Sequence, residues 1–270
     1  MKKSCFVSFA SGSYVDYIPF YIRSLRVVYP ECDIKVFVIE DIKGDLWKKL
    51  FKHGYNKYIV KCLDLVDFVK ILSGFKRKKR AQIIKSLRWL INPSYFRVYD
   101  YIYVGDIDMV FYPMGEHIFD YHIRHMKATG LPYSNKVREG TNRMTGIHFI
   151  DVKEYFNKVS KRIGILKEEI LNGECDFDFG KKGANEILLH DLIKLSGVGI
   201  KYNEKWHRET GSIHIGQSRI KKVKELGKLP IQAKEFFKNL YENDIIFNDL
   251  MQGNSRSGEL DLIHKLFCDE

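Results

Sequence analysis

The sequence predicts an α/β fold, in which a mixed, mostly parallel sheet is flanked by helices and followed by a C-terminal helical extension. The first observation behind this prediction is the order of the N-terminal elements, because apolar runs of strand length alternate with helix-like segments from the first residues on. This alternation is typical of an open, mostly parallel sheet. The second observation is that the chain shows helical patterns alone from Pro230 onwards.

Three strands are expected in the N-terminal part of the chain, at residues 5–10, 34–39 and 57–61. The second of these is almost entirely apolar, as a parallel strand covered on both faces should be. Apolar residues at spacings of three and four predict a helix between the first two strands, and this helix should end before Pro30. A further helix is expected at residues 46–53.

The later elements follow from the same apolar periodicity. A buried strand is expected at residues 101–104, and further strands at residues 126–131, 144–152 and 200–202. Helices are expected in the tail from residue 230 to residue 270 and at five other places, which are residues 65–72, 80–91, 114–125, 153–171 and 184–195.

Two carboxylates, Asp106 and Asp108, follow the predicted strand 101–104 directly after Gly105. Like charges this close repel each other, and desolvation adds to the cost. A divalent cation would compensate both charges and leave coordination sites open for phosphate oxygens. Ligands of open α/β sheets bind at the carboxyl ends of the strands, which is where this pair is expected. The alternative is a strand that ends in a solvated turn.

The composition is that of a globular protein, with 270 residues of which 45% are hydrophobic and 29% charged. The five cysteines are odd in number and none forms a C-x-x-C pair, which argues against a disulfide framework or a zinc site. The apolar run after the basic N-terminus is too short for a signal peptide, and no run approaches the length of a membrane span. We therefore expect a soluble, cytoplasmic protein.

The net charge of +11 is compatible with three kinds of partner: nucleic acid, an anionic membrane face or a phosphate-bearing small molecule. Basic residues are densest at 76–80 and 219–228, and neither run contains interleaved aromatics or a nucleic-acid-binding motif. We interpret both runs as solvated helix faces, with peripheral contact to an anionic membrane as the alternative. Nucleic acid is not expected as a partner.

Several segments, in this order along the chain, resemble the GT-A glycosyltransferases and, within them, glycosyltransferase family 8. The resemblance implies a GT-A-like (Rossmann-like) catalytic domain over residues 1–228, with residues 229–270 as a C-terminal helical extension of the same domain. The segments that carry it are residues 8–25 (first strand, nucleotide loop and helix), Arg88 (in the helix before the D-x-D strand), residues 99–108 (the D-x-D strand), residues 145–153 (a later glycine segment) and residues 214–219 (similar to a late H-x-G-x-x-K).

The sequence also departs from the family pattern. Thr145 stands where the family usually has Asn, and Arg219 replaces a Lys. The acidic-Gln-acidic signature is absent, and Asn185 and Glu186 stand near its place. These departures leave the donor sugar and the stereochemical outcome open.

The resemblance implies a metal site built from Asp106, Asp108 and His214. The ion would be Mn²⁺, because an imidazole ligand favours it over Mg²⁺, with Mg²⁺ as the alternative. It would stabilise the negative charge of a diphosphate leaving group. In this reading, the two aspartates act in catalysis as metal ligands rather than as a general acid–base pair. Taken alone, His214 would read as a core histidine.

The resemblance further implies how a nucleotide-sugar donor would be held. The backbone of Ala10, Ser11 and Gly12, with the side chain of Tyr14 or Asp16, would contact the nucleoside. Other implied donor contacts are those of Arg88, Gly216, Arg219 and Lys221. Glu186 would contact a sugar or act as the general base of an inverting enzyme. Trp206 and His207 would line the acceptor side or simply pack. Taken alone, Arg88 and Glu186 are also compatible with ordinary positions on a helix surface.

The function implied by the resemblance is a metal-dependent, UDP-sugar-dependent hexosyl- or pentosyltransferase, retaining as in the family, with a glycan or glycolipid as acceptor. Two alternatives stay open. A nucleotidyltransferase would normally carry an N-terminal Gly-rich loop with Arg and Lys, and residues 11–13 have neither. A basic nucleic-acid-binding protein without catalysis agrees with the charge, but not with an acidic pair at a strand end.

Overall fold

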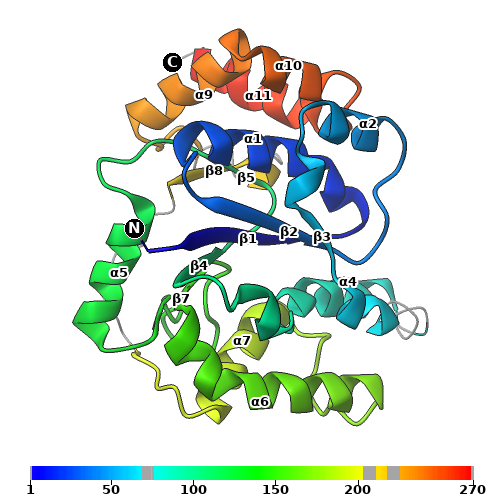
Figure 1. Cartoon of the computed structure of the whole chain (residues 1–270), viewed down its shortest axis with the longest axis vertical. Coiled ribbons are helices and arrows are strands. Elements are labelled where there is room, and N and C mark those ends of the chain that lie inside the picture. Colours follow the sequence, from blue (N-terminus) through cyan, green and yellow to red (C-terminus); the bar gives the residue numbers. More distant parts are fainter. Residues whose placement is uncertain (1, 69–73, 75, 203–210, 218–225, 269–270) are drawn as a thin grey trace.

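The computed structural model describes residues 2–68, 74, 76–202, 211–217 and 226–268. Within these residues, six strands form one sheet in the order β3-β2-β1-β4-β7-β6, and two more form a small separate sheet, β5-β8. Figure 1 shows the larger sheet in the middle of the molecule, with helices on both of its faces. The strands are β1 (Ser4–Ala10), β2 (Asp33–Val38), β3 (Ile59–Lys61), β4 (Tyr101–Val104), β5 (Met109–Phe111), β6 (Tyr133–Ser134), β7 (His148–Asp151) and β8 (Ser212–His214).

The pairing confirms the predicted mixed, mostly parallel sheet. Strand β1 pairs in parallel with β2 and with β4, and β2 pairs in parallel with β3. Strand β7 pairs antiparallel with both β4 and β6. The carboxyl ends of β1, β2 and β4 therefore meet at one edge of the sheet, which is where such sheets bind their ligands.

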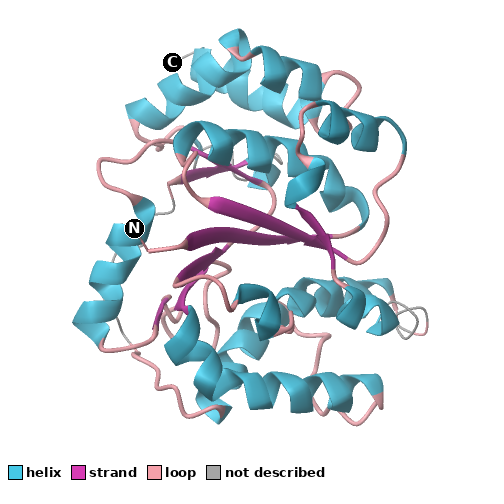
Figure 2. Ribbon diagram, in the orientation of Figure 1, coloured by secondary structure: helices cyan, strands magenta, loops and turns pink. Residues whose placement is uncertain are grey.

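The helices cover the two faces of the sheet, as Figures 1 and 2 show. Helices α1 (Ile18–Val28) and α2 (Gly44–Lys52) lie on one side, and the C-terminal helices pack over α1. Helices α4 (Arg77–Ser86), α6 (Val152–Leu171) and α7 (Ala184–Leu195) lie on the other side. The other α-helices of the described residues are α5 (Ile118–Thr129), which lies at one end of the sheet, and the C-terminal α9 (Ile231–Asn243), α10 (Ile245–Met251) and α11 (Ser257–Cys268).

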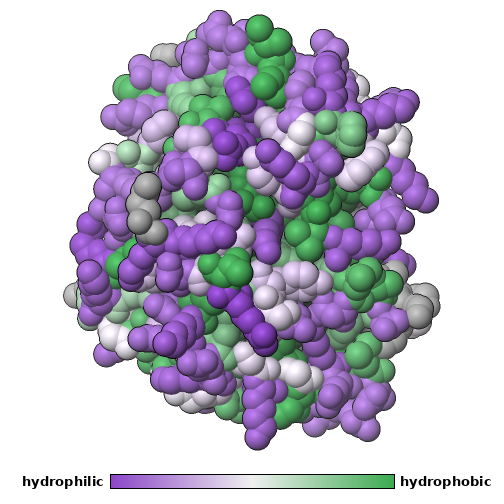
Figure 3. Space-filling model, viewed as in Figure 1, coloured by the Kyte–Doolittle hydropathy of each residue, from purple (hydrophilic) through white to green (hydrophobic). Residues whose placement is uncertain are grey.

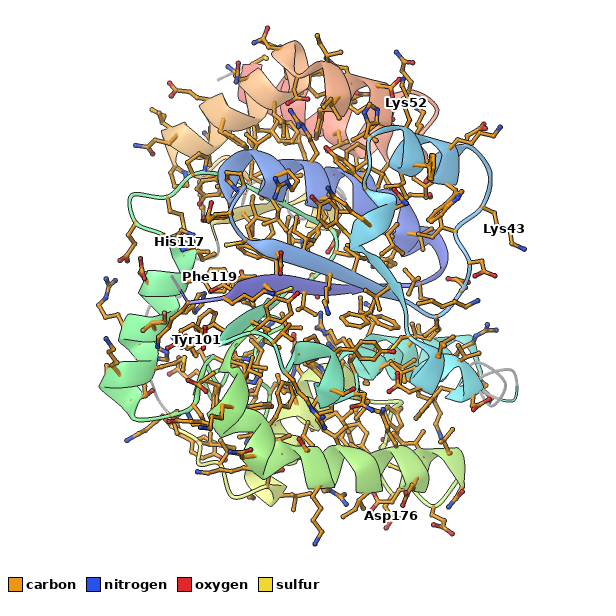
Figure 4. The ribbon with its side chains drawn as sticks, in the orientation of Figure 1. Lys43, Lys52, Tyr101, His117, Phe119 and Asp176 are labelled. Atoms are coloured by element: carbon orange, nitrogen blue, oxygen red, sulfur yellow. The ribbon has the colours of Figure 1, made fainter. Side chains whose placement is uncertain are left out.

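Two apolar cores correspond to these two sides. Phe6 of β1 belongs to the core under α1, whereas its neighbour Val7 belongs to the core under α6 and α7. This alternation follows from strand geometry, since successive side chains point to opposite faces. Figure 4 shows Tyr101 and Phe119 near the amino end of β4, where Tyr101 stacks on Phe149 with ring centroids 5.5 Å apart.

Most predicted elements are present, but several details of the prediction were wrong. Residues 126–131 were expected to be a strand, whereas α5 continues to Thr129 and ends at Gly130, whose left-handed conformation (φ 68°) caps it. Apolar character alone does not separate a short buried strand from the last turn of a helix. Residues 200–202 form no strand. The helix expected at 80–91 is α4 followed by a 3₁₀ turn, η4 (Leu87–Trp89).

The C-terminal helices are joined to α1 by apolar and charged contacts. The rings of Phe20 and Phe247 lie 5.3 Å apart, and Arg23 donates two hydrogen bonds from Nε to the Asp244 carboxylate, at 3.0 and 3.1 Å. Lys52 of α2, labelled in Figure 4, reaches Asp249 of α10 at 3.1 Å.

Hydrophilic side chains cover most of the face shown in Figure 3, with hydrophobic residues between them in small groups. Among the described residues, no helix combines the length and the apolar character that crossing a bilayer requires.

Candidate metal and nucleotide site

The connection from β4 to β5 brings the two predicted carboxylates to the ligand-binding edge of the sheet. Strand β4 ends at Val104, and the Ser8 hydroxyl of β1 donates a hydrogen bond of 2.9 Å to the Gly105 carbonyl. Ile107 is buried in the core, with 3% of its surface exposed. Asp106 and Asp108, on either side of Ile107, both line a pocket at this edge.

His214 joins the two aspartates through the small second sheet. It is paired with Met109 in the antiparallel β5-β8 register, and the Ile215 amide donates a hydrogen bond of 2.8 Å to the Asp108 carbonyl. His214 Nε2 lies 3.4 Å from Asp106 Oδ2, and its Nδ1 lies 3.3 Å from Asp108 Oδ2. One ligand atom of each of the three residues lies within 4.8 Å of the others. The structure thus brings His214 next to two aspartates that lie 106 and 108 positions before it in the sequence.

The charged groups of this cluster shift one another's pKa values. Burial acts to raise the pKa of Asp106, but the charge of Arg88 and the contact with His214 outweigh it and hold that pKa well below its usual range. Burial acts to lower the pKa of His214, whereas the two aspartates raise it, to about 10. In the metal-free protein, His214 is therefore a cation between two carboxylates at neutral pH.

The cluster has the shape and the chemistry of a cation site. Octahedral coordination with bonds of about 2.1 Å places ligand atoms roughly 3–4 Å apart, and one ligand atom from each of the three residues lies within 4.8 Å of the others. His214 Nδ1 is buried and lies 3.3 Å from Asp108 Oδ2 without the geometry of a hydrogen bond. Two glycines leave room for the carboxylates, since a Cβ on Gly146 would lie 2.9 Å from Asp106 Oδ2 and one on Gly216 would overlap Asp108 Oδ2. These residues fit a divalent cation.

Arg88 supports Asp106 from the side of η4. Its guanidinium donates a hydrogen bond to Asp106 Oδ1 and lies 4.4 Å above the ring of Trp89. Its side chain is 8% exposed. Arg88 was predicted in the helix before the D-x-D strand, and it lies in η4, which directly follows α4. Its pairing with Asp106 compensates part of the negative charge.

The pocket at this edge joins the cluster to the N-terminal loop and to two helices. Its volume is about 280 Å³, near the lower end of the range of small-molecule sites. Polar and charged side chains surround the cluster, while Phe9, Ile84 and Ile107 supply apolar surface. The polar and aromatic residues that line the pocket are Ser11, Tyr14, Lys85, Arg88, Asp106, Asp108, Asn185, Glu186 and His214.

Glu186 lies in the first turn of α7 and is held by two arginines. Its Oε1 accepts a hydrogen bond from Arg138 at 2.9 Å, and its Oε2 accepts one from Arg143 Nε at 2.9 Å. The side chain is only 13% exposed. Its neighbour Asn185 is also buried, with 9% exposed. The start of α7 thus forms a polar, pre-ordered wall of the pocket.

The predicted nucleotide loop forms a 3₁₀ turn, η1 (Gly12–Tyr17), which is separated from the end of β1 by Ser11 alone. Gly12 adopts φ 57°, a left-handed conformation that favours glycine, and its amide donates a hydrogen bond to Glu40 after β2. Asp16 is turned towards the C-terminal helices, because its Oδ2 accepts a hydrogen bond of 2.5 Å from Ser255.

Thr145, where the resembled family usually has Asn, is held by another side chain. Its amide donates a hydrogen bond of 3.2 Å to Asn135 Oδ1, which also accepts from the Thr145 hydroxyl. Asn135 Nδ2 lies 3.1 Å from the Nδ1 of the buried His148. This network fixes the chain just before Gly146, the glycine that leaves room for Asp106.

Some of the predicted site residues lie outside the described residues, namely Trp206, His207, Arg219 and Lys221. Three site residues were not predicted. Lys85 lies three residues before Arg88, a spacing that places two helical residues on the same side, and this spacing was the signal that could have identified it. Asn185 and Gly146 stand in quoted motifs, but only the structure shows that they face the cluster.

No protein-family model matches the sequence, and neither does any curated protein. Solved structures do resemble it. The galactosyltransferase LgtC, in complex with donor and acceptor sugar analogues, is 14% identical over 70% of each chain, with a TM-score of 0.42. Glycosyltransferase GlyE of Streptococcus pneumoniae is 13% identical over all of this chain and 63% of its own, with a TM-score of 0.43.

A third similar structure is a putative nucleotide-diphospho-sugar transferase from Desulfovibrio desulfuricans. It is 8% identical over 100% of this chain and 98% of its own, with a TM-score of 0.41. At TM-scores below 0.5, these likenesses carry no conclusion about activity, so the function has to be argued from the site.

Proposed function

We propose that this protein is a metal-dependent glycosyltransferase that moves a sugar from a UDP-sugar to a hydroxyl acceptor. The observation that carries the proposal is the convergence of Asp106, Asp108 and His214 within 4.8 Å at the carboxyl edge of a mostly parallel sheet. A divalent cation held there, Mn²⁺ by the chemistry of the imidazole ligand, would stabilise the charge that develops on a diphosphate leaving group.

The surrounding residues support donor binding. Ser11 and Tyr14 line the pocket on the side of β1, where a nucleoside would be held. Lys85 adds a positive charge to the same pocket, and a cation there would attract phosphate oxygens. The chain itself thus supplies a loop for the nucleoside and charge for the diphosphate.

Glu186 and Asn185 are proposed to face the transferred sugar. Both line the pocket at the start of α7, where Asn185 is buried and Glu186 is half-buried. Retention of the anomeric configuration is proposed on the resemblance to family 8 alone, and NMR of the anomeric proton of the product tests it. A glycan or glycolipid acceptor is proposed on the same basis.

The competing functions find less support in the site. A nucleic-acid-binding protein gains nothing from two carboxylates in this pocket, because they repel phosphates unless a cation lies between. The nucleotidyltransferase alternative would need basic residues in the N-terminal loop, and the described loop residues that line the pocket are Ser11 and Tyr14.

The experiment that tests the proposal is a donor screen. The purified protein is incubated with Mn²⁺ and a panel of UDP-, GDP-, CMP- and dTDP-sugars, and release of the free nucleotide is measured. We expect slow hydrolysis of one or more UDP-sugars that chelation of the metal stops. Metal-independent release, or release from none of the UDP-sugars, would contradict the proposal.

A further inference from the structure

The turn between α10 and α11, together with Glu259 in the first turn of α11, holds the N-terminal loop at five points. Asn254 Nδ2 donates a hydrogen bond of 3.0 Å to the Asp16 carbonyl, and Ser255 Oγ donates one of 2.5 Å to the Asp16 carboxylate. Arg256 Nη2 donates a hydrogen bond of 2.8 Å to the Ser13 carbonyl. The other two contacts are those of Tyr17 with Arg256 and with Glu259. They join residues more than 230 positions apart in the sequence.

Tyr17, Arg256 and Glu259 form a closed triangle. The Arg256 guanidinium lies 4.6 Å above the Tyr17 ring, and the Tyr17 hydroxyl donates a hydrogen bond of 2.5 Å to Glu259 Oε2. Arg256 Nη1 lies 3.3 Å from Glu259 Oε1. The Arg256 side chain is 14% exposed, so these contacts are well shielded from water and hold the loop in one conformation.

The turn is itself pre-ordered. Asn254 Oδ1 accepts a hydrogen bond of 2.8 Å from the Arg256 amide, while its amide nitrogen reaches Asp16. One asparagine side chain therefore fixes both the shape of the turn and its distance from the loop. The loop in turn supplies Ser11 and Tyr14 to the pocket beside the metal cluster.

We propose that Asn254, Ser255, Arg256 and Glu259 are positioning residues, which keep the Ser11–Tyr17 loop in the conformation that binds the nucleoside. This inference rests on the proposed function for the identity of the ligand, a nucleoside, whereas the ordering of the loop does not depend on it. It assigns a role in donor affinity to the C-terminal helical extension, and it makes Arg256 the central residue. It also gives Asp16 a different role from the predicted nucleoside contact, because Asp16 anchors the loop.

The chain offers a matched control for Arg256. Arg23 of α1 also ties the C-terminal helices to the N-terminal half, through its hydrogen bonds to Asp244. Arg23 does not line the pocket and is not in the loop. Arg23→Gln therefore removes a comparable buried contact of the same helices without touching the loop.

The first measurement is amide hydrogen exchange of residues 11–17 without any ligand, which does not depend on the proposed function. We expect Arg256→Gln to speed exchange in this segment, Arg23→Gln to leave it as in the wild type, and Arg256→Lys, which keeps one donor for Ser13, to lie between them. Unchanged exchange in Arg256→Gln would overturn the proposal.

The second measurement is calorimetric binding of UDP in saturating Mn²⁺, and of Mn²⁺ alone. If the competent loop conformation falls to a tenth of the population, the Kd for UDP rises about tenfold, while the affinity for Mn²⁺ alone stays unchanged. An equal loss of UDP affinity in Arg256→Gln and Arg23→Gln would overturn the role of Arg256. Absence of UDP binding by the wild type would instead contradict the proposed function, and the exchange data would still decide whether the turn orders the loop.

Discussion

At the scale of single residues, the site depends on two glycines, Gly146 and Gly216, as much as on its charged side chains. Asp108 is 7% exposed and lies against Gly216, and Asp106 lies against Gly146. Neither glycine has a positive φ. Glycine is therefore needed at these positions to leave room for the carboxylates, and not for its backbone conformation. A methyl group at either position would push a carboxylate out of the cluster.

Gly216→Ala is therefore expected to weaken Mn²⁺ binding by at least about tenfold, as loss of the shell that supports metal ligands commonly does. Isothermal titration calorimetry with Mn²⁺ measures it. Gly164→Ala is the matched control, because Gly164 lies in α6 with nothing within 4 Å of the added Cβ. Equal affinities in the two variants would show that Asp108 does not hold the metal.

His214 makes metal binding depend on pH. Its pKa of about 10 in the metal-free protein means that it carries a proton at neutral pH, whereas a metal ligand must be neutral. Mn²⁺ binding at pH 7 should therefore release about one proton, seen as a dependence of the calorimetric enthalpy on the ionisation enthalpy of the buffer. His214→Gln should bind more weakly and release none. Identical proton release in both proteins would contradict this assignment.

The same shift determines how the stability of the metal-free protein varies with pH. The folded pKa of His214 lies above its ordinary value of 6.5, so its contribution is complete below pH 6.5 and is lost as the pH rises towards 10. Asp106 has a lowered pKa, and its contribution is present above the ordinary value of 3.8 and lost in more acidic solution. Both contributions are therefore present between about pH 4 and 6.5.

At the scale of elements, helix α7 presents Glu186 to the pocket already neutralised by two arginines. Both carboxylate oxygens accept hydrogen bonds, so the geometry favours a role in ordering the wall of the pocket over that of a free general base. Arg143 also lies against Gly183 at the start of the helix. A general base and a residue that orders the pocket wall would respond differently to replacement of Glu186 by Gln.

Glu186→Gln is expected to destabilise the protein by about 1–2 kcal/mol, because it removes partly buried ion pairs. The value is kept this low because Arg138 is half exposed and water screens its charge. Turnover of the folded enzyme should fall less than about tenfold, because the positioning contacts are weakened rather than lost. Thermal unfolding and donor hydrolysis measure the two quantities. A loss of about 10² or more in turnover at unchanged stability would identify Glu186 as the base after all.

Sequence periodicity predicted the elements that carry the site better than those around it. The strand at 101–104 and the helix at 184–195 agree with the structure to the residue. Their apolar runs are long or uninterrupted and end at clear stops, so the pattern predicts one type of element with defined ends. Residues 126–131 were misread, since the last helical turn before Gly130 is too short to show a helical period of its own. The pairing of β5 with β8, which delivers His214, joins residues about 100 positions apart, and no local pattern specifies it.

At the scale of the whole molecule, the C-terminal helices are part of the core on the α1 side. Phe237, Phe247 and Leu260 are fully buried or nearly so, in the same cluster as Phe6 and Phe20. The resemblance predicts that residues 229–270 extend the first domain, and we propose that the two unfold as one unit. The positions of Phe247 and Ile245 on α10 allow a test.

Phe247→Ala is expected to cost about 3–5 kcal/mol, as large-to-small changes at aromatic core positions do. Ile245→Ala should change the stability by less than about 0.5 kcal/mol, because Ile245 is 84% exposed. Differential scanning calorimetry measures both. One cooperative transition that shifts as a whole agrees with a single unit, whereas two transitions, of which only one moves, would contradict it.

The central claim is that Asp106, Asp108 and His214 hold a divalent cation on a UDP diphosphate, and thermal unfolding with UDP and Mn²⁺ tests it most directly. At about 100 times its Kd the ligand stabilises by roughly 2.7 kcal/mol, so the Tm should rise by about 5–10 °C. Asp108→Ala should abolish the rise, and Asp45→Ala, at a carboxylate 90% exposed, should keep it. An unchanged Tm of the wild type at saturating UDP and Mn²⁺ would contradict the account.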